Sequence, residues 1–120
     1  MSIIDGKVNF KVGKFVRESL YELFNEKEIS NELLKMMQKN KYSKEMLGIN
    51  YALLIKNDKN EDMKNKLIIS GGSRYWASGT IKINGEEFFI CNDWYERHDR
   101  DNRSKFIKWF LEIEKKFQDK

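Results

Sequence analysis

Proline is absent from this 120-residue sequence, and cysteine and histidine occur once each. The absence of proline excludes proline-rich linkers and docking peptides. A single cysteine, Cys91, excludes an internal disulfide and is typical of a reducing compartment, so we expect a cytoplasmic protein. No apolar stretch approaches the roughly 18 residues of a membrane span, and the N-terminal MSIIDGKVNF lacks the features of a signal peptide. The sequence therefore predicts no membrane association.

Motifs for catalysis are also lacking. There is no Ser-His-Asp pattern, no nucleotide-binding glycine loop and no pair of metal ligands at a useful spacing. His98 has no histidine or cysteine partner for a metal, and Cys91 lies in an apolar segment that favours a buried, inert thiol. We expect a protein that is not an enzyme and needs no cofactor or metal.

Apolar and charged residues are both plentiful. Hydrophobic residues make up 40% of the chain and aromatic residues 13%, which predicts one packed domain over residues 1–120. Charged residues reach 35% with mixed sign, and the net charge is +4. This balance permits a nucleic acid or an acidic partner and requires neither.

Helical patterns dominate the first half of the chain. Apolar residues recur at helical spacing over residues 12–25, which predicts a first helix. Ser30 is suited to cap a second helix over residues 31–38, with Ile29 packing back on Leu34. We expect a tight turn at residues 40–42, and then a third helix capped by Ser43 and continuing through Leu54. Gly48 weakens the middle of that helix.

The second half alternates strands and turns before a final helix. Residues 57–66 read as a polar loop, and residues 67–70 as a short strand that Gly71-Gly72 interrupts. Asn84-Gly85 between residues 80–83 and 87–91 predicts a β-hairpin with a type I′ turn. Residues 102–116 form an amphipathic helix capped by Asp101 or Asn102. The fold class is therefore α+β.

The order of these elements resembles the winged helix-turn-helix superfamily. Residues 12–95 supply three helices and a hairpin in the wing position, and the C-terminal helix is an addition. The segments KYSKEMLGINYALL, RYW, FFICNDWYE and FIKWF are also similar to small C-terminal domains of some prokaryotic restriction and defence proteins. The resemblance implies a non-catalytic domain that binds double-stranded DNA.

The candidate DNA-contacting residues centre on the third helix and the segment before it. Residues 35–44 hold four lysines and no acid, which suits contacts to phosphates. Ser43 and Asn50 are polar members of the expected recognition helix, and Asn50 is a candidate base reader. Arg74 beside Tyr75-Trp76 either clamps phosphates or pairs with a carboxylate such as Asp93 or Glu96. The full set of candidates is Lys35, Lys39, Lys41, Ser43, Lys44, Asn50 and Arg74.

Two observations keep an alternative open. Glu86 and Glu87 make the hairpin tip acidic, so the hairpin either contacts DNA poorly or only completes the sheet. The three arginines of residues 94–105 contact phosphates or pair with neighbouring acids. A protein-interaction module, such as a phage- or plasmid-borne inhibitor of a host defence enzyme, fits these features too.

Overall fold

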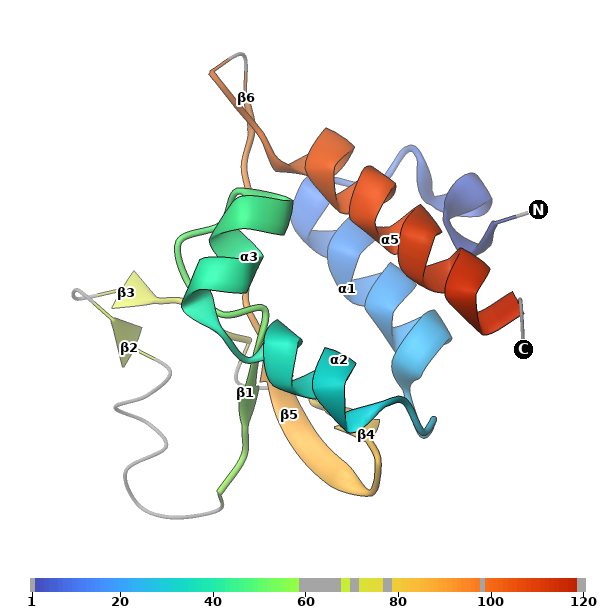
Figure 1. The fold of residues 1–120 in the computed structure, drawn as a ribbon. Coiled ribbons are helices and arrows are strands. Elements are labelled where there is room, and N and C mark those ends of the chain that lie inside the picture. Colours follow the sequence, from blue (N-terminus) through green and yellow to red (C-terminus); the bar gives the residue numbers. More distant parts are fainter. Residues whose placement is uncertain (1, 59–67, 70–71, 77–78, 98, 119–120) are drawn as a thin grey trace.

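Helices form the first part of the chain, short antiparallel strands follow, and a long helix ends it (Figure 1). The computed structural model describes residues 2–58, 68–69, 72–76, 79–97 and 99–118. The helical elements are η1 (Ile3–Lys7), α1 (Val12–Phe24), α2 (Asn31–Met37), α3 (Asn40–Leu47) and α5 (Asn102–Gln118). The strands are β1 (Leu54–Lys56), β2 (Ile68–Ile69), β3 (Gly72–Ser73), β4 (Ile81–Ile83), β5 (Glu86–Ile90), β6 (Glu96–Arg97) and β7 (Arg100–Asp101). The α+β class is confirmed, and none of the described helices is long and apolar enough to cross a bilayer.

Three of the four predicted helices form close to their expected bounds. Ser30 caps α2 by accepting a hydrogen bond from the backbone N of Leu33 at 3.2 Å. Asp101 caps α5, because its carboxylate accepts bonds from the backbone N and the hydroxyl of Ser104 at 3.1 and 2.6 Å. These bonds satisfy N–H groups that the first turn of a helix leaves unpaired, so local sequence alone places these helix starts.

The third helix differs from its predicted course. It begins at Asn40 rather than after a cap at Ser43, and it ends at Gly48, whose φ of +75° forms a left-handed C-cap. The predicted turn at residues 40–42 is the first turn of α3. Leu54, expected on the same helix, pairs instead with Ile90 in the sheet. A short apolar run reads equally as helix or strand, and here the long-range pairing decides.

The main sheet has three antiparallel strands in the order β1-β5-β4. The register pairs Leu54 with Ile90 and Ile81 with Phe88. These four side chains are at most 1% exposed. Helix α1 contacts β4, so the first helix closes over the hairpin side of the sheet.

Residues 84–85 form the turn of the predicted hairpin, and φ is +53° at Asn84 and +79° at Gly85. Its tip is tied down: the Asn84 amide accepts from Ile29 N at 2.6 Å and donates to Ile29 O at 2.9 Å. A further bond joins Asn84 N to Lys27 O at 2.9 Å. The β4–β5 hairpin therefore completes the sheet and is fixed to the α1–α2 connection, which is the second of the two roles expected for it.

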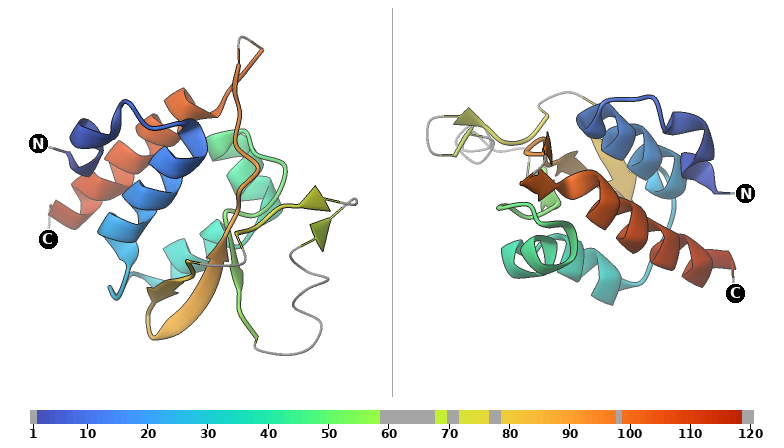
Figure 2. Two further views of the ribbon diagram at one scale, coloured as in Figure 1. Left: turned by 180° about the vertical axis from the view of Figure 1, so that it is seen from behind. Right: turned by 90° about the horizontal axis from the view of Figure 1, so that it is seen from above.

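Aromatic side chains build the centre of the core. Phe106 of α5 lies between 5.4 and 5.9 Å, ring to ring, from four other aromatic residues: Phe15, Trp94, Trp109 and Phe110. Helix α5 contacts both α1 and α3 and lies between them (Figure 2). This helix thus joins the N-terminal helix to the helix pair α2–α3.

The predicted strand at residues 67–70 is described only at Ile68 and Ile69, which form β2. Gly72, expected to interrupt the strand, pairs with Ile69 as part of β3. Residues 67 and 70 of the predicted strand lie outside the described residues, and so does Gly71. Most of the predicted loop at 57–66 lies outside them as well.

Replacing Asn84 by alanine tests how firmly the hairpin tip is held. The variant loses three side-chain hydrogen bonds, the longest of them to Asn31 Oδ1 at 3.5 Å, and places alanine at a positive φ. We therefore expect the free energy of unfolding to fall by about 2 kcal/mol. Urea denaturation measures this change. Asn50→Ala is the control, because Asn50 is exposed and its side chain makes no hydrogen bond among the described residues. This control should change the free energy of unfolding by less than about 0.5 kcal/mol. Equal stability of the two variants would contradict the role given to Asn84.

Candidate nucleic-acid interface

Helices α2 and α3 are joined by only two residues, Gln38 and Lys39. The four lysines of this helix pair are all exposed: Lys35, Lys39, Lys41 and Lys44. Among the described residues, none of them has a carboxylate within the 4.0 Å that defines an ion pair. Their charge is therefore available to a ligand.

The surface of α3 divides into an outer and an inner face. Lys41 and Lys44 are three residues apart, so they lie on the same side of the helix. Ser43 and Leu47 are fully buried on the opposite side. Glu45 is exposed one turn from Lys41 and is the one acid that α3 carries. The outer face of α3 is thus basic with one acidic residue beside it.

Ser43 cannot contact DNA in this structure, and its assignment as a cap and a contact residue is wrong. Its side chain is 0% exposed, and its hydroxyl oxygen accepts a bond from Leu53 N at 2.9 Å. Asn40 acts in the same way one turn earlier, with its amide oxygen accepting from Ala52 N at 2.8 Å. Both side chains hold the chain that leads into β1.

Asn50 is exposed but does not belong to a recognition helix. It follows Gly48, where α3 has ended, and lies in the loop that leads to β1. The sequence placed it correctly at the surface and wrongly on the helix.

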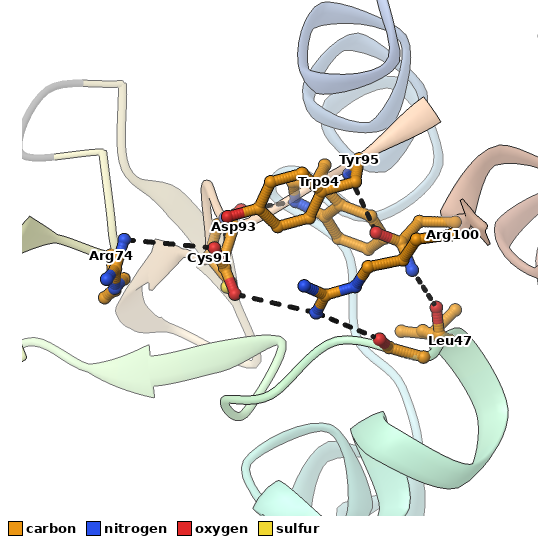
Figure 3. Close-up of polar contacts among 9 residues, drawn as sticks. Leu47, Arg74, Cys91, Asp93, Trp94, Tyr95 and Arg100 are labelled. Carbon is orange, nitrogen blue, oxygen red and sulfur yellow. Dashed lines mark hydrogen bonds and ion pairs between the residues drawn. The ribbon is translucent and has the colours of Figure 1, made fainter. Parts of the chain in front are cut away.

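Arg74 lies beside a buried carboxylate, as one of its two expected roles requires. Its Nη1 is 4.0 Å from an oxygen of Asp93, whose side chain is only 5% exposed (Figure 3). The other expected carboxylate, Glu96, pairs instead with Arg103 at 2.6 Å. A hydrogen bond with Tyr51 is the largest of the effects that raise the pKa of Arg74, so the guanidinium stays charged. Tyr51 also brings Arg74 to the loop after α3, where Asn50 lies.

A second arginine faces Asp93 from the other side. Arg100 of β7 has its Nη2 4.0 Å from the other Asp93 oxygen and 3.4 Å from Gly48 O, to which it donates (Figure 3). Its guanidinium lies 4.3 Å from the ring centre of Tyr95. The sequence places Arg100 in one charged segment with Arg97 and Arg103. No local signal in the sequence indicates which of the three arginines lies next to Asp93.

The structure gives these three arginines different surroundings. Arg103 is engaged internally, since it donates to the backbone oxygens of Val8 and Phe10 as well as to Glu96. Arg97 pairs at 3.8 Å with Asp99, and both side chains are more than half exposed. Such exposed ion pairs contribute little to the stability of the fold. Of these three arginines, Arg100 is the one that joins the β6–β7 hairpin to the end of α3.

Cys91 and Tyr75 line the buried side of this cluster. Burial raises the pKa of the Cys91 thiol to about 12, so the thiol stays protonated at neutral pH. Burial likewise raises the pKa of Tyr75, whose hydroxyl donates to Ala52 O at 2.7 Å. Neither group is set up as a nucleophile. Cys91 is buried as the sequence predicted.

Comparison of the chain with protein-family models, with curated proteins and with solved structures found no match.

Replacing Ser43 by alanine tests its structural role. The variant leaves the buried N–H of Leu53 without its acceptor, so we expect a loss of about 2 kcal/mol of stability in urea unfolding. Lys44→Ala, at the next and exposed position, should change stability by less than about 0.5 kcal/mol. A Ser43 variant as stable as the Lys44 variant would show that the buried hydrogen bond is unimportant.

Proposed function

We propose that this protein binds double-stranded DNA without catalysing a reaction on it. In this proposal α2 and α3 act as a helix-turn-helix, and the basic outer face of α3 approaches the duplex. The observation that carries the proposal is the row of four exposed lysines, Lys35, Lys39, Lys41 and Lys44, free of ion pairs to described residues. Arg74 and Asn50 extend this surface beyond the end of α3.

Three cations of η1 and α1 have partners within the fold. Lys7 pairs with Glu22 at 3.0 Å, Lys14 lies over the ring of Phe10, and Arg17 faces Trp76. Their charge is partly used for internal contacts. This difference supports α2–α3, rather than α1, as the DNA-binding side.

The proposed interface departs from a winged helix at its wing. The β4–β5 hairpin is tied to residues 27 and 29, and its acids have partners: Glu86 pairs with Lys56 at 3.1 Å and Glu87 accepts from Asn57. In our proposal DNA contacts therefore come from the helix pair and not from this hairpin. Phosphate contacts position the protein, and Asn50 is the candidate reader of base edges.

A second candidate function, protein binding, is favoured by one apolar groove. Leu33 and Met36 of α2 face Tyr42, Ile113 and Phe117 across a hollow of about 310 Å³. Such a groove suits an apolar side chain of a partner protein. The small size, the high charge and the acidic tip of the β4–β5 hairpin suit one form of this alternative, an inhibitor of a host defence enzyme borne by a phage or plasmid.

Salt dependence of duplex binding separates the two functions. We expect log affinity for a duplex of about 20 bp to fall with log salt with a slope steeper than about −3, since each phosphate contact contributes about 0.9. Replacing Lys39, Lys41 and Lys44 by glutamine should flatten the slope by about 2.7. Fluorescence anisotropy of a labelled duplex between about 50 and 200 mM salt measures both values.

The control carries the same change of charge elsewhere. Lys27, Lys82 and Lys115 are exposed and lie outside α2–α3, so their replacement by glutamine should leave the slope unchanged. A wild-type protein that does not bind duplex at about 50 mM salt, or binds with a slope near zero, would exclude DNA binding and leave the protein-binding alternative.

A further inference from the structure

The Asp93 cluster joins two arginines from distant parts of the chain. Arg74 precedes the bridge between Tyr75 and Cys91, and Arg100 lies on β7. Their guanidinium nitrogens approach different oxygens of Asp93, each at 4.0 Å (Figure 3). The cluster therefore has two positive charges for one negative charge.

The carboxylate is buried, and the two arginine side chains are partly exposed. The Asp93 side chain is 5% exposed, whereas the side chains of Arg74 and Arg100 are 30% and 26% exposed. A buried carboxylate needs nearby positive charge, which holds both arginines in place. Both arginine side chains reach the surface, so an anionic ligand can approach them from the solvent.

Arg100 keeps most of its hydrogen-bonding capacity. Charge-assisted hydrogen bonds to carboxylates measure about 2.7–2.9 Å, so the 4.0 Å approach to Asp93 is an electrostatic contact only. Among the described residues, the only hydrogen bond from this guanidinium is the long one to Gly48 O at 3.4 Å. The remaining N–H donors of this planar, forked group match the oxygens of a phosphate.

Aromatic contacts limit how far the two guanidinium groups move. Arg100 lies 4.3 Å from the ring centre of Tyr95, and Arg74 lies 5.8 Å from that of Tyr51. A side chain fixed before binding loses less entropy when the ligand arrives. The cluster is thus arranged before any ligand binds.

The position of the cluster connects it with the lysines of α3. Arg100 bonds to Gly48, the C-cap that follows α3, and Lys44 lies in the last turn of that helix. Tyr51, next to Arg74, lies in the loop that follows. Positive charge therefore continues from the outer face of α3 past its C-terminal end.

We propose that Arg74 and Arg100, held by Asp93, form a clamp for backbone phosphates of the bound duplex, beyond the α2–α3 lysines. This inference rests on the proposed function. Asp93 is a positioning residue here, because it acts through the two arginines and does not touch the ligand.

Arg100→Lys is the first test, because it keeps a positive charge next to Asp93 and so preserves the fold. Lysine retains the charge and loses the forked donor geometry. We expect the salt slope of duplex binding to stay unchanged and the affinity to fall roughly tenfold, the effect of a lost bidentate contact. Affinity equal to that of the wild-type protein would overturn the clamp.

A second test removes one arginine of the clamp at constant net charge. Asp93→Asn combined with Arg100→Gln deletes one charge of each sign, and its fold is checked by thermal unfolding. We expect the slope to flatten by about 0.9, because one phosphate contact is lost. The matched control, Asp99→Asn with Arg97→Gln, deletes the exposed pair of the same hairpin and should leave the slope unchanged.

The outcomes distinguish this inference from the proposed function. If the α2–α3 triple variant flattens the slope and the Arg100 variants bind like the wild-type protein, DNA binding stands and the clamp is wrong. If the wild-type protein shows no salt-dependent duplex binding, both are wrong. If the Arg97 control flattens the slope as much as the Arg100 variant, the contact belongs to the hairpin generally and not to the Asp93 clamp.

Discussion

The buried amide of Asn102 fixes the relative positions of three parts of the chain. Its side chain donates to Leu47 O, the last residue of α3, at 3.0 Å and accepts from Tyr95 N at 2.8 Å. Its backbone N donates to Tyr95 O at 3.0 Å. Asn102 is only 1% exposed, so breaking these bonds would strand polar groups without water. The end of α3, the start of α5 and the segment before β6 therefore hold together as one unit.

This junction determines what the surface presents. With α3 fixed at its end by Asn102, and along its length by Asn40 and Ser43, the polar residues of its inner face are used for structure. The outer face is left to Lys41, Lys44 and Glu45. The same junction brings β7, and with it Arg100, to the end of α3. The lysines and the Asp93 cluster become neighbours through these contacts, although they are distant in sequence.

The two hairpins differ in structure from what the sequence suggested. The β4–β5 hairpin was expected in the position of a wing, but Asn84 ties its tip to Ile29. The β6–β7 hairpin was read only as a charged loop, yet it extends away from the body of the protein in the views of Figures 1 and 2. The asparagine that permits the tight turn also binds the turn to Ile29, and backbone bonds from Asn84 N to Lys27 O and from Glu26 N to Lys82 O hold the same hairpin.

Several elements of the fold follow from chemistry that acts over a few neighbouring residues. Serine and aspartate caps placed the starts of α2 and α5, helical periodicity gave α1, and Asn84-Gly85 gave the turn, because each signal acts over a few residues. The tertiary structure alone decided the end of α3 and the strand β1, since residues 52–54 are apolar in either conformation and only the pairing of Leu54 with Ile90 selects the strand. It also decided that Ser43 is buried and that Asp93 lies between Arg74 and Arg100. Burial and charge pairing depend on which distant segments the fold brings together, and local sequence patterns do not contain that information.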